Sequence, residues 1–256
     1  MIKVLAMEEV KSNSKELANK EFEKLKEDIL KNYKAKLNFV DVEENELYTV
    51  VGEFEIEFDN FLEYIEFCLK YSPDVEVLKP SKIVLDKEEL NKVLAFVIHT
   101  FKEFTNKYKI GFNVYLKDKK DYDIEKYKNG LYDDEELYEL EEEYIRVKAV
   151  FEGEGKSEKE VVANLLSSLD MDNIIVNKIL TQNYEKDEFK GLIGVDLFCK
   201  PFELFEIAYK YQPVALSVQK DKITLSLSEI QDIGNELGGA IFELSHAVVN
   251  RFGNIK

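Results

Sequence analysis

An internal repeat constrains the fold of this chain more than any other feature of the sequence. When the chain is shifted by 140 positions, residues 61–90 lie on residues 201–230 without a gap, and nine of these 30 positions are identical. Because segments that repeat at a fixed offset form one recurring structural unit, we expect two copies of one module. The identical pairs are Glu63/Glu203, Glu66/Glu206, Lys70/Lys210, Tyr71/Tyr211, Pro73/Pro213, Lys82/Lys222, Ile83/Ile223, Leu85/Leu225 and Glu89/Glu229.

The apolar residues that follow the repeat predict a long amphipathic helix in each copy. They recur at steps of three and four residues, which places them on one buried face. They are Leu90, Val93, Val97, Phe101 and Phe104 in the first copy, and Ile230, Ile233, Leu237, Ile241 and Leu244 in the second.

The first copy has a β-α-β-β-α-β order of predicted elements, which is the ferredoxin-like or split β-α-β arrangement. The second copy repeats this order from Leu192 but ends before a final strand. The elements of the first copy are a strand at 53–58, a helix ending at Tyr71, a hairpin of 75–78 and 82–85 around Lys79-Pro80-Ser81, a helix over about 87–107 and a strand at 110–116.

A further strand and helix precede each copy, within residues 2–33 and 145–169. The repeated module can therefore also be β-α-β-α-β-β-α, and the strand order stays open. We predict an α+β fold, an internal duplication of two ferredoxin-like modules with antiparallel sheets covered by helices. The predicted divisions are a first module at 1–116, an acidic tyrosine-rich linker at 117–144 and a second module at 145–256.

The linker carries 12 acidic residues against five lysines, which is −7 of the formal charge of −17. One interpretation is a solvated linker in which residues 133–143 form an exposed acidic helix; the other is a docking segment for a basic partner. We favour the first, because runs of like charge are usually hydrated.

The overall composition argues against several classes of protein. Arg146 and Arg251 are the only arginines, so the acidic chain is poorly equipped to neutralise a nucleic-acid backbone. No apolar run is long enough to span a bilayer, and the first residues lack a signal peptide. Cys68 and Cys199 suit reduced thiols, so we expect a cytoplasmic protein without a membrane partner. The excess of lysine and glutamate, with no tryptophan, is typical of thermophile proteins.

The chemical motifs are weak. Residues 153–157 (Gly-Glu-Gly-Lys-Ser) lie where a phosphate-binding loop belongs, but the first Walker glycine is absent and Ser157 begins a capping box. His99 and His246 have no metal-ligand spacing, so we expect no metal and no cofactor. Three glutamates at 53–57 are expected to lie on a solvated sheet face rather than to bind a cation.

A lysine-tyrosine pair recurs at a helix end in both copies, as Lys70-Tyr71 and Lys210-Tyr211. A lysine at a helix C-terminus complements the helix dipole, so a structural role is the favoured interpretation. A duplicated binding site is the alternative.

Small residues form a line on the last helix at Gly234, Gly238 and Ser245. A glycine in a helix interior costs about 1 kcal/mol relative to alanine, so a close contact should offset it. We predict an interface here, with the other module, a second subunit or a ligand.

These observations favour a non-enzymatic regulatory or interaction protein that binds a protein or a small ligand and self-associates. The alternative is an enzyme with a site between the modules, built from lysine, tyrosine and carboxylate side chains. An RNA-associated protein is the third hypothesis, disfavoured by the charge.

Overall fold

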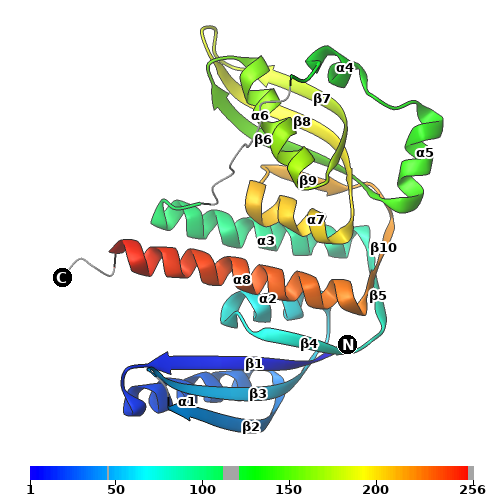
Figure 1. The fold of residues 1–256 in the computed structure, drawn as a ribbon. Coiled ribbons are helices and arrows are strands. Elements are labelled where there is room, and N and C mark those ends of the chain that lie inside the picture. The colour runs from blue at the N-terminus through cyan, green and yellow to red at the C-terminus, as the bar shows by residue number, and fades with distance from the viewer. Residues whose placement is uncertain (45, 112–120, 253–256) are drawn as a thin grey trace. The chain divides into compact units, whose positions relative to one another are not determined.

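The computed structural model describes residues 1–44, 46–111 and 121–252, and it combines helices with antiparallel sheets (Figure 1). The strands are β1 (Ile2–Ser12), β2 (Lys34–Glu44), β3 (Tyr48–Phe58), β4 (Asp74–Lys79), β5 (Lys82–Asp86), β6 (Ile145–Gly155), β7 (Ile175–Asn183), β8 (Phe189–Cys199), β9 (Ala215–Val218) and β10 (Lys222–Ser226). The helices are α1 (Lys15–Asn32), α2 (Phe61–Tyr71), α3 (Lys87–Tyr108), α4 (Ile124–Asn129), α5 (Asp134–Glu143), α6 (Glu158–Met171), α7 (Pro201–Glu206), the π-helical turn η1 (Ile207–Tyr211) and α8 (Leu227–Phe252). Most of the predicted strand at 110–116 lies outside the described residues.

The chain forms two compact units. Unit 1 comprises Met1–Ile83 together with the segment that begins at Thr224, and unit 2 comprises Val84–Ile223. Unit 1 therefore contains helix α8, and unit 2 contains α3, while the boundary between the units falls within β5. The module boundaries at residues 116 and 145 were predicted from the sequence repeat, whereas the two units are defined by their internal contacts. The predicted boundaries therefore stay a prediction.

Unit 1 is built on a four-stranded sheet in the order β2-β3-β1-β4, in which all neighbours are antiparallel. Alternate residues of β1 and β3, such as Val4 and Phe54, are fully buried because they share the face that α1 and α2 cover. Phe22 of α1 and Phe67 of α2 are buried with them. The alternation of the sequence thus gives the sheet one apolar face.

Helix α8 completes unit 1 by packing on α2 and β4. Two of its amide side chains bond to the backbone of β4: Asn235 Oδ1 accepts from Val75 N at 2.8 Å, and Gln231 Oε1 accepts from Val77 N at 3.0 Å. These bonds satisfy donors that an edge strand would otherwise leave to solvent.

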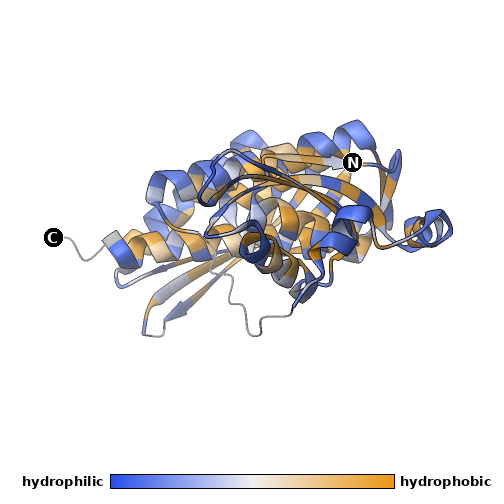
Figure 2. Cartoon of the chain, turned by 90° about the horizontal axis from the view of Figure 1, so that it is seen from above, coloured by the Kyte–Doolittle hydropathy of each residue, from blue (hydrophilic) through white to orange (hydrophobic). Residues whose placement is uncertain are grey.

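Unit 2 has a second antiparallel sheet, in the order β7-β8-β6-β9, with contacts from α6, α7 and α3. Asn91 of α3 accepts a hydrogen bond from Val218 N of β9, as the amides of α8 do for β4. At the opposite edge, Leu131 N donates to Asn177 O of β7 at 3.0 Å. The acidic segment therefore lies against unit 2, and its helix α5 is the expected exposed one, with no buried residue and a mostly hydrophilic surface (Figure 2).

The predicted hairpin of strands 75–78 and 82–85 is wrong. Strand β4 pairs with β1, whereas β5 pairs with β10 in a separate two-stranded sheet. The alternation correctly located both strands, but it carries no information on which partner buries their apolar faces.

None of the helices in the described ranges is long and apolar enough to cross a membrane.

Candidate functional site

The first lysine-tyrosine pair converges on one carboxylate within unit 1. Lys70 Nζ lies 2.7 Å from Asp28 Oδ2, and Tyr71 Oη donates to the same oxygen at 2.6 Å. Lys70 Nζ also lies 2.8 Å from Tyr71 Oη. The three groups tie the end of α2 to α1.

The second pair forms an equivalent cluster within unit 2. Lys210 Nζ binds Asp172 Oδ2 at 2.7 Å, and Tyr211 Oη donates to that oxygen at 2.6 Å. Here the cluster is less accessible, with the Lys210 and Asp172 side chains 23% and 14% exposed, against 49% and 44% for Lys70 and Asp28.

The electrostatics of both clusters favour the structural interpretation. Burial, together with the hydrogen bond to Asp28, raises the pKa of Tyr71 to about 12, and burial with the bond to Asp172 raises the pKa of Tyr211 further. A tyrosine that acts as a general acid or base near neutral pH needs a lowered pKa instead. These phenols therefore act as hydrogen-bond donors that hold two helices together.

The line of small residues on α8 faces α2 inside unit 1. A Cβ at Gly234 would overlap Tyr64 Oη, and one at Gly238 would lie 3.4 Å from Ser72 Cα. Tyr64 Oη donates to Ile230 O at 3.0 Å, which requires this close approach. The two glycines are therefore explained by packing within the unit. Ser245 bonds to Ile241 O of its own helix, and an interface of this line with a second subunit stays a prediction.

The remaining sequence motifs lie in structural positions. Gly153 and Gly155 belong to strand β6 rather than to a loop, and Ser157 caps α6 by accepting from Glu160 N at 3.2 Å. Glu55 lies 2.6 Å from Lys3 Nζ on the outer sheet face.

The cysteines are buried, and burial raises the pKa of the Cys68 thiol to about 12 and that of Cys199 further, so neither thiol resembles a nucleophile. His99 is exposed beside Glu103. In the part of the chain that the structure describes, no three histidine, cysteine or acidic residues are arranged to hold a metal ion.

A polar cluster that the sequence reasoning missed centres on Arg146 in unit 2. Its guanidinium donates two hydrogen bonds to Asp196, from Nε to Oδ1 at 3.0 Å and from Nη2 to Oδ2 at 2.8 Å. Its Nη1 donates to Glu141 Oε1 at 3.0 Å. Asn177 Nδ2 donates to Asp196 Oδ2 at 2.9 Å. Burial opposes ionisation of Asp196, but the bonds from Arg146 and Asn177 outweigh it and lower the Asp196 pKa.

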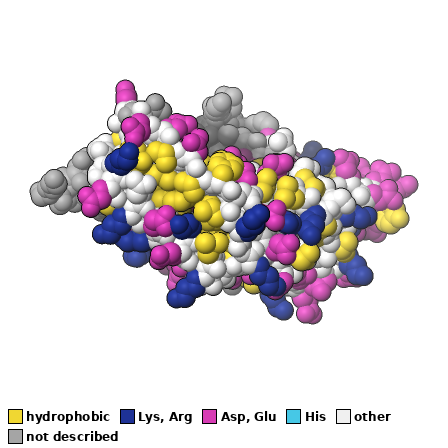
Figure 3. All heavy atoms as spheres, turned by 90° about the horizontal axis from the view of Figure 1, so that it is seen from below, with side chains coloured by type: hydrophobic (Ala, Val, Ile, Leu, Met, Phe, Trp, Pro, Cys, Tyr) yellow, Lys and Arg dark blue, Asp and Glu magenta, His cyan; other side chains and the backbone are white. Residues whose placement is uncertain are grey.

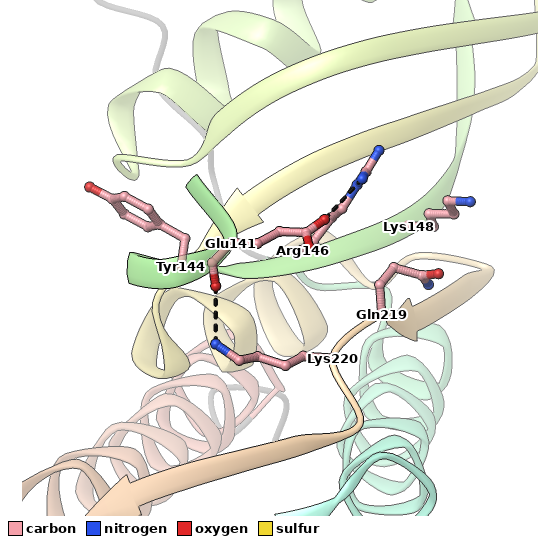
Figure 4. A pocket seen from close by; sticks show the side chains of 6 residues that line it. All are labelled: Glu141, Tyr144, Arg146, Lys148, Gln219 and Lys220. Atoms are coloured by element: carbon pink, nitrogen blue, oxygen red, sulfur yellow. Dashed lines mark hydrogen bonds and ion pairs between the residues drawn. The ribbon is translucent and has the colours of Figure 1, made fainter. Parts of the chain in front are cut away.

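This cluster forms one wall of a cavity of about 210 Å³. Figure 4 shows Glu141 between Arg146 and Lys220, whose Nζ donates to the Glu141 backbone oxygen at 3.1 Å. Lys148 projects beside Gln219, and among the described residues no salt bridge joins Lys148 or Lys220 to a carboxylate. The remaining lining residue is Tyr144.

A second hollow of about 390 Å³ on the outer face of the same sheet shares Arg146 and Lys148. Its other lining includes Val150, Leu180 and Gly194. The two hollows thus place a group of cations next to an apolar surface. The scarcity of arginine was the one sequence signal that could have drawn attention to Arg146.

The sequence matches the MJ0538 family over residues 3–251. It is 60% identical over 259 aligned positions to a Methanocaldococcus jannaschii protein named "Uncharacterized protein MJ0538", an alignment that covers 98% of this chain and all of that protein. No solved structure matches the chain. The chain therefore belongs to the MJ0538 family.

Proposed function

We propose that this protein is a non-enzymatic binding protein whose cavity at Arg146 takes a small ligand with a carboxylate or phosphate group. The single observation that carries the proposal is the meeting of Arg146, Lys148 and Lys220 in one cavity of an acidic chain. A cluster of cations in a concave site concentrates anions even where the net charge of the protein is negative.

The geometry suggests how an anion would bind. Asp196 holds the guanidinium from one side, which fixes its orientation, and leaves Nη1 bonded to the exposed end of Glu141. Because α5 buries no residue, the Glu141 carboxylate is the replaceable partner. A ligand carboxylate or phosphate would take its place and gain Lys148 and Lys220, while an apolar part of the ligand would lie over Val150 and Leu180.

We also propose that the two units are diverged copies of a ferredoxin-like module. The order β1-α1-β2-β3-α2-β4 and the strand order β2-β3-β1-β4 support this, as do the matching orders β6-α6-β7-β8-α7-β9 and β7-β8-β6-β9. The equivalent lysine-tyrosine-aspartate clusters give independent support.

Calorimetric titration at low salt with inorganic phosphate, citrate and AMP tests the ligand proposal. We expect at least one of these probes to bind and the double variant Lys148→Gln/Lys220→Gln to weaken its binding about tenfold or more. The matched control is Lys20→Gln/Lys24→Gln, two exposed lysines of α1 in unit 1. The proposal fails if none of the three probes binds, or if the control variant loses as much affinity as the cavity variant.

A further inference from the structure

The four edge strands of the two main sheets differ in whether other parts of the chain form hydrogen bonds to them. Side chains of α8 bond to β4, Asn91 of α3 bonds to β9, and Leu131 bonds to β7. Among the described residues, β2 has β3 as its only sheet neighbour. This strand therefore offers a row of backbone donors and acceptors along an 11-residue edge.

The open edge also carries exposed apolar side chains. Phe39, Val40 and Val42 are 46%, 45% and 41% exposed. Figure 3 views the protein from the side on which β2 lies in Figure 1, and it shows hydrophobic side chains gathered among lysines and acidic residues. Apolar side chains next to an unpaired strand edge are the usual mark of a strand that accepts another strand.

The charges of β2 are ordered along the strand. Lys34 and Lys36 lie opposite Glu57 and Glu55 of β3, on the outer face of the sheet. The register shifts between Leu37 and Phe39, and beyond the shift Asp41 and Glu43 lie opposite Val51 and Thr49 on that same face. The outer face of β2 is therefore basic in its first half and acidic in its second.

This order makes β2 complementary to itself. We propose that a second copy of this chain binds along β2, with the two β2 strands antiparallel about a two-fold axis between Asn38 and Phe39. Lys34 then faces the partner's Glu43, and Lys36 faces the partner's Asp41.

On the other face of the sheet, Leu37 meets the partner's Val40 and Ala35 meets the partner's Val42. Because of the register shift at Asn38, each of these pairs joins residues of the same face, as antiparallel pairing requires. The β2-β3-β1-β4 sheets of the two copies then become one continuous sheet.

Charged residues on an edge strand can also serve to prevent pairing. Charges that prevent pairing lie opposite like charges when two copies meet. In the antiparallel arrangement of two β2 strands, each lysine instead lies opposite an acidic residue of the partner. The ion pair that Lys34 makes with Asp59 does not compete strongly, because both side chains are about two-thirds exposed.

Sedimentation equilibrium of the full chain over a range of concentrations tests the proposal. We expect a monomer–dimer equilibrium in the wild-type protein. Lys36→Glu and Asp41→Lys should each weaken dimerisation about tenfold, because each reversal places two pairs of like charges in the interface. The double variant Lys36→Glu/Asp41→Lys should restore dimerisation, and Lys20→Glu on α1 should leave it unchanged. Circular dichroism verifies that every variant is folded.

A wild-type protein that stays monomeric would overturn the proposal. Dimerisation that the single variants do not weaken, or that the double variant does not restore, would also overturn it. Anion binding at Arg146 uses other residues in unit 2, so the titration and the sedimentation experiment fail independently.

Discussion

Glu8 is a carboxyl group inside the apolar core of unit 1, and it gives the stability of the fold a distinctive dependence on pH. It lies on the buried face of β1 with Val4 and Ala6, is 4% exposed, and is opposite Gly52 of β3. Among the described residues its Oε1 has no hydrogen-bond partner. Burial raises the pKa of Glu8 to about 8. At the seventh position of β6, unit 2 has the apolar Phe151 instead.

The magnitude follows from linkage between protonation and folding. The carboxyl ionises near 4.5 when unfolded and near 8 when folded. Between these values the unfolded chain releases a proton that the folded protein keeps, so rising pH favours unfolding by about 1.4 kcal/mol per pH unit. Relative to a side chain that stays neutral, Glu8 then destabilises the fold by about 3 kcal/mol at pH 7 and about 5 kcal/mol above pH 8.

Glu8→Gln is the informative variant, because glutamine has nearly the same shape and does not titrate. Urea unfolding followed by circular dichroism at several values between roughly pH 5 and pH 8 gives the free energy of unfolding of both proteins. We expect the free energy of unfolding of Glu8→Gln, relative to that of the wild-type protein, to increase steadily with pH across this range. Glu9→Gln, on the exposed side of the same strand, should show no such growth. If the difference in free energy of unfolding between Glu8→Gln and wild type does not change with pH, the reasoning is refuted. The absolute size of that difference does not matter, because a buried amide has its own cost that is independent of pH.

Two further pairs of variants test the packing described above. Gly234→Ala should lower the free energy of unfolding by about 1–3 kcal/mol in urea titrations, because its methyl group would collide with Tyr64, whereas Gly239→Ala meets no atom within 4 Å and should raise it by up to about 1 kcal/mol through helix propensity. A loss at both positions would contradict this. Asp172→Asn should lower the melting temperature more than Asp28→Asn, because the charge-assisted bonds of the less exposed aspartate contribute about 1.5–3 kcal/mol, whereas water screens those of the more exposed one. Equal melting temperatures would show that exposure does not set the strength of these clusters.

The helices and the half-buried strands were predictable because burial on one face leaves a period in the sequence. The predicted helix at about 87–107 corresponds to α3, and the strand at 53–58 lies within β3. Strand β2 was missed because its alternation is interrupted: the register shift between Leu37 and Phe39 leaves two short alternating halves instead of one continuous period. Pairing partners were not predictable, since the alternation of β4 and β5 is equally consistent with a hairpin and with two separate sheets.

The candidate site was predictable only where the chain repeats itself. The repeat identified Lys70, Tyr71 and their counterparts, but not Asp28 of α1 or Asp172 at the C-cap of α6, because both aspartates lie outside the aligned segment. The cavity at Arg146 left no motif at all. Its lining comes from α5, β6 and the turn before β10, with Asp196 of β8 holding Arg146, and only the tertiary fold brings these elements together.

The presence of α8 in unit 1 has a consequence for biosynthesis. The strands β1 to β4 of this unit are made before unit 2, whereas Gln231 and Asn235 follow the β4 residues that they contact by 154 and 160 residues. Domains usually fold in the order of their synthesis. Here the β4 edge of the unit 1 sheet stays uncovered until the whole of unit 2 has been made. A nascent chain halted shortly after β4 would therefore expose that edge to pairing with other strands.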